Sequence, residues 1–119
     1  MTTIVVTGAN RGIGLGLVKE FLKDSSELTS IKDPRLKVME LDVTDDDSIM
    51  KVAEKVGEEL EGNGLDLLIN NAETLVPVVL NGPLDRKAVM ANFEVNAVGT
   101  LMVTQVRGLV NSASWTVGR

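Results

Sequence analysis

Short apolar runs alternate along the chain with longer stretches in which apolar residues recur every three or four positions. Aliphatic and β-branched runs are typical of buried parallel strands, and they occur here at 3–7, 36–41 and 65–70. Helical spacing predicts helices over 12–24, over the stretch that follows a capping signal at 44–47, and over 84–106. The alternation predicts an α/β fold in one domain, residues 1–119, with a parallel sheet between helical layers.

A glycine-rich turn stands between the first predicted strand and the first predicted helix. It reads Thr7-Gly8-Ala9-Asn10-Arg11-Gly12-Ile13-Gly14. The free N–H groups and the positive dipole end of a helix can hold a phosphate at such a point. Glycine suits three positions for different reasons: a tight exit from the strand at Gly8, close approach of backbone to a ligand at Gly12, and closure of the helix on the sheet at Gly14.

Composition limits the partners that we expect. The net charge is −5 without a basic run, which argues against nucleic acid, so local geometry must hold an anionic cofactor. No apolar run approaches membrane-spanning length, and the first predicted strand begins too early for a signal peptide. We therefore expect a cytoplasmic protein that does not enter membranes. The chain has no cysteine, histidine or tyrosine, and no metal site is predicted.

The glycine turn fits the pattern T-G-x-x-x-G-x-G, and fits neither G-x-G-x-x-G nor the phosphate-loop pattern. The chain thereby resembles the short-chain dehydrogenase/reductase family, and its run from Gly12 to Lys19 is similar to the sniffer-like carbonyl reductases of that family. The resemblance covers about residues 3–106. It implies a reduced, truncated Rossmann-like three-layer domain without the family's second strand and C-terminal half. Too few residues separate Gly14 from Leu36 for a helix, that strand and another helix.

The resemblance implies a dinucleotide cofactor, NADP(H) rather than NAD(H). Arg11 stands where a basic residue of the family reaches the 2′-phosphate, and the alternative is an uncommitted surface arginine. Asp42 with Val43 resembles the family's adenine-binding motif. The position of Asp42 would also suit the ribose hydroxyls or a plain strand end.

The stretch Asn70-Asn71-Ala72 resembles the family's N-N-A-G, with Glu73 in place of the glycine. The extra side chain and charge predict weak cofactor binding. The predicted cofactor-binding residues are Gly8, Asn10, Arg11, Gly12, Ile13, Gly14, Asp42, Val43, Asn70 and Ala72.

Asn96 matches the helix asparagine of the family's catalytic set, and is either a vestigial catalytic residue or a polar residue tolerated in a helix. The family's proton-transferring tyrosine–lysine pair cannot exist in a sequence without tyrosine. Two functions stay open. One is an NADP(H)-dependent reductase of carbonyl compounds that is catalytically incomplete in this chain. The other is a non-catalytic nucleotide-binding or subunit-pairing fragment, such as a splice product or a degenerate copy.

The absence of the family's second strand and of its C-terminal half leads to two structural predictions. Leu36–Leu41 should move in to pair directly with Ile4–Val6. The apolar face of the helix over 84–106 should be left uncovered and cause self-association.

Overall fold

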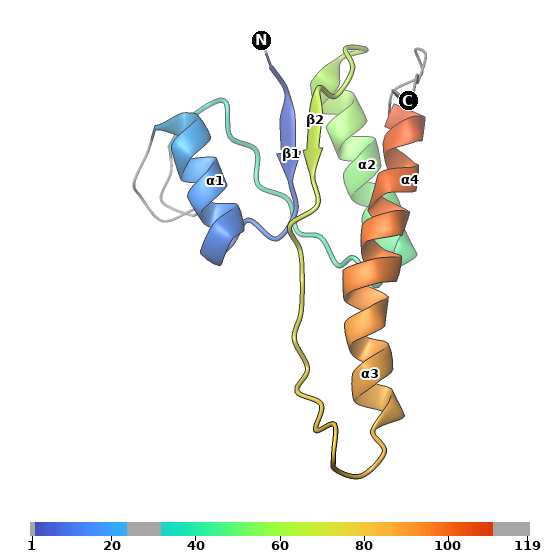
Figure 1. The fold of residues 1–119 in the computed structure, drawn as a ribbon. Helices are drawn as coiled ribbons and strands as arrows, with labels where there is room; N and C mark the ends of the chain where they lie inside the picture. Colours follow the sequence, from blue (N-terminus) through green and yellow to red (C-terminus); the bar gives the residue numbers. More distant parts are fainter. Residues whose placement is uncertain (1, 24–31, 111–119) are drawn as a thin grey trace, which may run out of the picture.

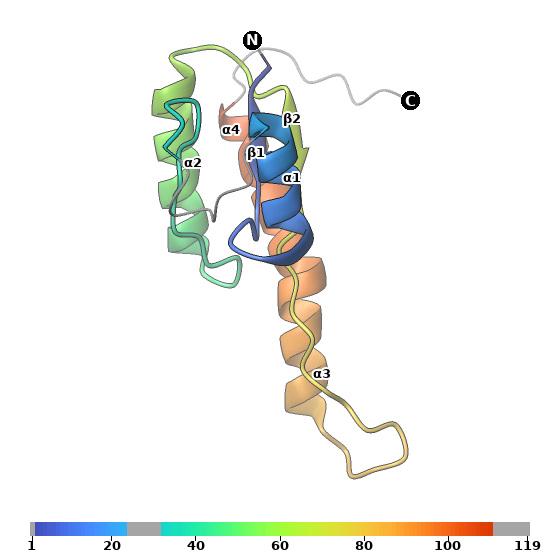
Figure 2. The same cartoon turned by 90° about the vertical axis from the view of Figure 1, so that its left-hand side faces the viewer.

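The computed structural model describes residues 2–23 and 32–110 (Figure 1). The elements in chain order are β1 (Ile4–Val6), α1 (Gly12–Leu22), α2 (Asp46–Leu60), β2 (Leu67–Ile69), α3 (Arg86–Phe93), the π-helical segment η2 (Glu94–Gly99) and α4 (Thr100–Val110). In Figures 1 and 2, α1 covers one face of the sheet, while α2 and α4 lie on the other. This arrangement confirms the predicted α/β class with helices on both sides of a parallel sheet.

The sheet of the described residues consists of two parallel strands. Val5 of β1 is opposite Leu68 of β2, and the ladder continues where Thr7 N donates to Ile69 O over 3.0 Å. The carboxyl ends of both strands therefore lie at the same edge of the sheet. This edge is the one where ligands bind in open α/β sheets.

The predicted pairing of Leu36–Leu41 with β1 is wrong. This stretch is extended but belongs to no strand, and in both views it runs past the β1 edge of the sheet. Side-chain contacts at Asp33, Lys37 and Asp42 take the place of the predicted backbone pairing. Asp33 binds Arg35 at its start, Lys37 Nζ lies 3.7 Å from Glu59 Oε2 on α2, and Asp42 N donates to Ser48 Oγ over 2.9 Å. The contacts of Lys37 and Asp42 attach the stretch to α2, and no backbone ladder joins it to the sheet of the described residues.

The helix predicted over 84–106 exists but is not uniform. It runs without a break through α3, η2 and α4, from Arg86 to Val110, with π-helical turns in the middle. Gly99 ends η2 against the loop before α2, where an added Cβ would lie 2.8 Å from Val43 O. The tail beyond residue 110 and the stretch 24–31 lie outside the described residues.

The apolar core is thin. Its buried apolar residues in the described chain are Leu15, Val18, Ile49, Leu60, Leu65 and Ala88. A residual apolar cavity of about 50 Å³ lies where the sheet meets α2 and α4. None of the helices in the described ranges combines the length and the apolar composition that crossing a membrane requires.

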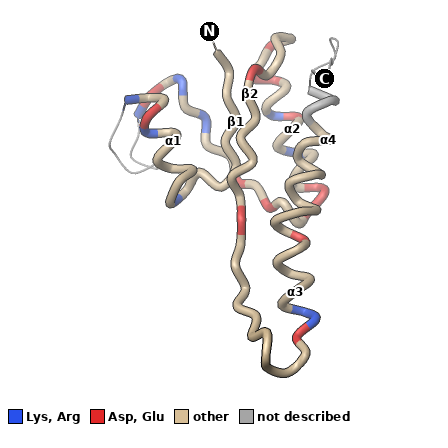
Figure 3. The backbone as a smooth tube through the Cα atoms, viewed as in Figure 1, with Lys and Arg blue, Asp and Glu red and all other residues tan. Residues whose placement is uncertain are grey.

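Between β2 and α3 the chain forms an extended arm, residues 73–85, that runs down beside α3 and turns back into it (Figures 1 and 2). Leu75 is 82% exposed and Leu80 is 94% exposed. Residues 74–84, which lie between Glu73 and Asp85 in the sequence, carry no charge, and Figure 3 shows most of the arm in tan. The arm therefore presents apolar side chains to solvent.

Candidate functional site

The glycine turn leaves β1 and enters α1 with two glycines in the left-handed region. Gly8 has φ +64° and packs so closely on β2's exit that an added Cβ would lie 2.7 Å from Ala72 Cα. Gly12 has φ +57°, and no atom outside its own neighbours lies within 4 Å of the position of an added Cβ. The backbone is thus close-packed at Gly8 and open to an incoming group at Gly12.

The first turn of α1 has no capping side chain. Arg11 at its N-cap makes no side-chain cap hydrogen bond, and the first turn carries no acidic residue. By contrast, Asp45 caps α2 and Asp85 caps α3 through their side-chain oxygens. The N–H groups of a helix's first turn need acceptors, so the start of α1 offers donors and a positive dipole end to an anion.

A hydrogen-bond network joins the carboxyl ends of β1 and β2. Thr7 is a buried residue, 4% exposed, and its hydroxyl accepts from the N–H groups of Asn71 and Ala72 at 3.1 and 3.0 Å. The Asn71 amide donates in turn to Thr7 O at 3.1 Å and to Gly8 O at 3.0 Å. This network brings together Gly8 and Ala72, two of the predicted cofactor-binding residues.

Thr7 and Asn71 were not among the predicted site residues. Their position at the ends of consecutive parallel strands is the signal that could have pointed to them. Asn70, which was predicted to bind cofactor, points elsewhere: its Nδ2 donates to Thr104 Oγ1 on α4 over 3.0 Å. Asn10, Arg11 and Ile13, which flank Gly12 in the sequence, are exposed.

Asp42 and Val43 lie where the extended stretch enters α2. Asp42 Oδ1 accepts from Thr44 N at 2.9 Å and from Thr44 Oγ1 at 2.7 Å. The hydroxyl and backbone N–H of Thr44 stabilise the carboxylate and lower the pKa of Asp42. Val43 packs against Gly99 of the long helix.

Two asparagines of the long helix bind the arm. Asn96 Oδ1 accepts from Thr74 N at 2.9 Å, and Asn96 Nδ2 donates to Thr74 O at 2.8 Å. Asn92 makes the same pair of bonds with Val76, both at 2.8 Å. The side chain of Asn96, predicted as a vestigial catalytic residue, is thus engaged with backbone, and Asn92 is a partner that the sequence analysis missed. Its spacing of four from Asn96 was the available signal.

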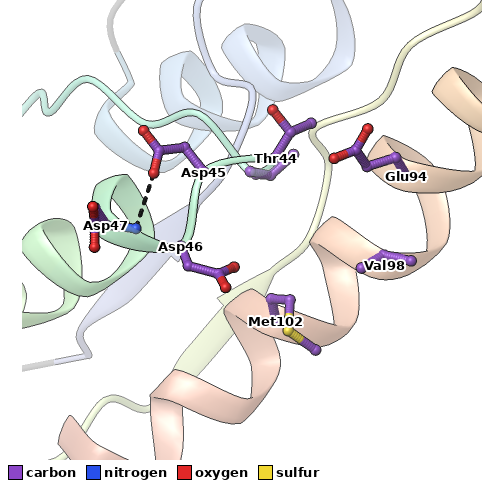
Figure 4. Close-up of a pocket in the computed structure, with 8 residues that line it drawn as sticks. Thr44, Asp45, Asp46, Asp47, Glu94, Val98 and Met102 are labelled. Carbon is purple, nitrogen blue, oxygen red and sulfur yellow. Dashed lines mark hydrogen bonds between the residues drawn. The ribbon is translucent and has the colours of Figure 1, made fainter.

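A depression of about 470 Å³ with an acidic lining contains no residue of the glycine turn (Figure 4). Its lining comes from the start of α2 and from the long helix: Val43, Thr44, Asp45, Asp46, Asp47, Glu94, Val98 and Met102. Acidic residues complement the positive end of α2, and they would repel a phosphate-bearing ligand. Among the described residues no group of His, Cys, Asp and Glu is arranged to hold a metal ion.

Comparisons with known proteins show which family the chain resembles. The family model of short chain dehydrogenases matches residues 2–111. Galactitol 2-dehydrogenase of Agrobacterium fabrum is 30% identical in a match over 92% of this chain and 51% of that enzyme.

Two solved structures share the fold. The Caenorhabditis elegans protein Sniffer, which is assigned as a carbonyl reductase, has a TM-score of 0.84 and 38% identity over 92% of this chain and 54% of its own. The NADPH-bound carbonyl reductase of chicken fatty liver has a TM-score of 0.80 and 31% identity over 92% of this chain and 48% of its own. The chain spans about half the length of these relatives.

Proposed function

Since this chain belongs to the short-chain dehydrogenase/reductase family, we propose that its glycine turn binds a nicotinamide dinucleotide, NADP(H) rather than NAD(H). The family consists of oxidoreductases, and carbonyl reductases are among the solved structures that the chain resembles. The observation that carries the proposal is the open Gly12 at the uncapped start of α1. It is the part of the site where a phosphate can approach backbone donors without meeting a side chain.

The residues present suit such a cofactor. An anion at the start of α1 would meet N–H groups, the helix dipole and the guanidinium of Arg11, and no carboxylate of the first turn. The remaining predicted contacts are Gly8, Asn10, Ile13, Gly14, Asp42, Val43, Asn70 and Ala72. Asn70 already binds Thr104, and exposed Glu73 adds a negative charge beside the site, so we propose weak binding.

The preference for NADP(H) rests on Arg11. Its guanidinium is exposed and directly precedes Gly12, where it can bind phosphate oxygens in a bidentate manner. The chicken carbonyl reductase structure, which contains NADPH, supports the same preference.

We propose that this chain is catalytically incomplete for the reduction of carbonyl compounds. A bound nicotinamide would supply the hydride, and the alkoxide that forms needs a positioned proton donor. The sequence contains no tyrosine, and the Asn96 side chain is bonded to Thr74. Loss of a general acid alone removes about 10²–10⁴-fold in rate, so we expect no NADPH oxidation above background with dicarbonyl or quinone substrates.

Fluorescence titration of the purified chain with NADPH and NADH tests the proposal. Gly12→Asp should abolish the binding of NADPH, because it places a carboxylate where the phosphate would lie. Gly62→Asp is the matched control, since Gly62 also has a positive φ, +86°, and open space around it. Equal loss in both variants, or no saturable binding by the wild type, would refute the assignment. Steady turnover that disappears in Gly12→Asp would refute catalytic incompleteness.

We also propose self-association through the arm and the long helix. Exposed apolar side chains there are Leu75, Val78, Val79, Leu80, Leu84, Val89, Met90, Phe93, Val98 and Leu101. Most monomers expose no contiguous apolar patch larger than a few hundred Å², so we expect a second copy of the chain to cover these side chains. Sedimentation at tens of micromolar, the range of weak association, should show oligomers. Phe93→Lys should reduce them and Met50→Lys, an exposed apolar position on α2, should not; a wild-type monomer would contradict the proposal.

A further inference from the structure

Asn92 and Asn96 bind backbone in a repeating pattern. Each amide uses its oxygen as acceptor and its nitrogen as donor toward both polar groups of one arm residue, Thr74 or Val76. These two pairs form what we call the asparagine clamp. Within it, Asn92 Nδ2 also donates to Ala88 O of its own helix over 3.0 Å, and Asn92 is the less exposed member. The orientation of the Asn92 amide is therefore determined by three bonds.

The clamp forms because the two-residue repeat of an extended chain nearly equals the rise of four residues along a helix. Two residues of extended backbone span about 6.6 Å, and four residues of helix rise about 6 Å. Side chains four apart on a helix can thus meet alternate residues of an extended segment. The asparagine amides take the place that a neighbouring strand would take, with one donor and one acceptor for each residue bound.

The clamp continues into a longer polar row on the helix, Asn92, Asn96, Thr100 and Thr104. Thr104 Oγ1 accepts from Asn70, and Thr100 Oγ1 donates to Asn96 O over 3.3 Å. A spacing of four drifts by about 40° per step on a regular α-helix. The wider turns of η2 offset part of that drift, so the row stays on the side that faces the segment. The helix therefore binds the exit of β2 at Asn70, Thr74 and Val76.

We propose that Asn92 is a positioning residue of the cofactor site, an inference that rests on the proposed function. Ala72 packs on Gly8 and donates to Thr7, and one residue, Glu73, separates it from the clamped Thr74. The path of the backbone beside the glycine turn is thus determined from both sides. Asn92 binds Val76, the second clamped residue, and the arm beyond it is exposed and uncharged up to residue 84. Without Asn92, the bonds of Thr74 to Asn96 alone attach the arm to the long helix. The segment after Ala72 is then no longer held in position relative to Gly12.

The test compares Asn92→Ala and the milder Asn92→Ser with Asn81→Ala, the same change at an exposed asparagine of the arm. Two quantities are measured on the full chain: hydrogen exchange of the Val76 amide without cofactor, and the Kd for NADPH. In Asn92→Ala we expect exchange at Val76 to accelerate and the Kd to rise, each about tenfold. Asn92→Ser, which keeps a hydroxyl, should lie between, and Asn81→Ala should leave both within about twofold of wild type.

The outcomes separate the two claims. Faster exchange at Val76 with an unchanged Kd means that Asn92 only shapes the arm; the positioning role is then wrong, and the proposed function stands. A wild type that does not bind NADPH refutes the proposed function and the positioning role together. If Asn92→Ala does not fold, the Kd and the exchange of Asn92→Ser decide by the same criteria.

Discussion

Gly14→Ala tests how α1 closes on the sheet. A Cβ at Gly14 would lie well inside van der Waals contact of both the Gly8 carbonyl oxygen and the Asn71 side-chain amide. One of these groups must move. Overpacking of this kind costs about 1–3 kcal/mol, and displacing the Asn71 amide removes bonds to Thr7 O and Gly8 O that contribute about 0.5–1.5 kcal/mol each. The higher helix propensity of alanine relative to glycine offsets at most about 1 kcal/mol of this loss.

The expected net loss is therefore about 2–3 kcal/mol in the free energy of unfolding. Urea denaturation followed by circular dichroism measures it as a midpoint lower by about 1–2 M. Gly16→Ala is the matched control, because it lies in the same helix with nothing within 4 Å of its Cβ position, and should be neutral or stabilising. Asn71→Ala should cost less in the Gly14→Ala background than in wild type, since the clash disappears with the amide. Equal stability of Gly14→Ala and Gly16→Ala would refute this reasoning.

Three further predictions concern single side chains. Thr44→Val should raise the pKa of Asp42 towards its ordinary value of 3.8 in an NMR titration. Because the folded pKa is lowered, the stabilisation from Asp42 is present above pH 3.8 and is lost as the pH falls through the folded pKa. The variant keeps the backbone N–H bond and should show a weaker form of this acid dependence. Asp45→Ala removes the cap of α2 and should cost about 1 kcal/mol in a thermal melt, whereas Asp46→Ala should cost less. Arg11→Ala should weaken NADPH binding about tenfold and NADH binding by less in parallel titrations, because NADH lacks the 2′-phosphate.

Local signals in the sequence predicted much of the fold correctly. The strand–glycine turn–helix unit, the capped start of α2 and the long helix over 84–106 all follow from short-range spacing, and their ends agree to within a few residues. The family assignment likewise came from a contiguous motif at Thr7–Gly14 and is confirmed by the match over residues 2–111. The roles of individual site residues stay predictions.

Non-local partners account for what the sequence could not predict. Leu36–Leu41 has a strand-like composition, but a strand needs a neighbour in register, and this stretch is bound to α2 through Lys37 and Asp42. The π-helical turns of η2 span six residues, too few for their apolar spacing to differ visibly from that of an α-helix. In the sequence, Asn92 cannot be distinguished from any asparagine tolerated in a helix. Its role follows only from the position of Val76 on the arm.

The small sheet ties the stability of this chain to its candidate site. Parallel sheets are normally larger and covered on both faces, and here two strands of three residues each make up the sheet of the described residues. Much of the bonding that joins their carboxyl ends comes from Thr7 and Asn71. Substitutions at these two residues would disturb folding as well as the candidate site, so neither can isolate the function of the site. Substitutions at Gly12 and Arg11 can isolate it, because Gly12 adjoins open space and Arg11 is exposed at the surface of the turn.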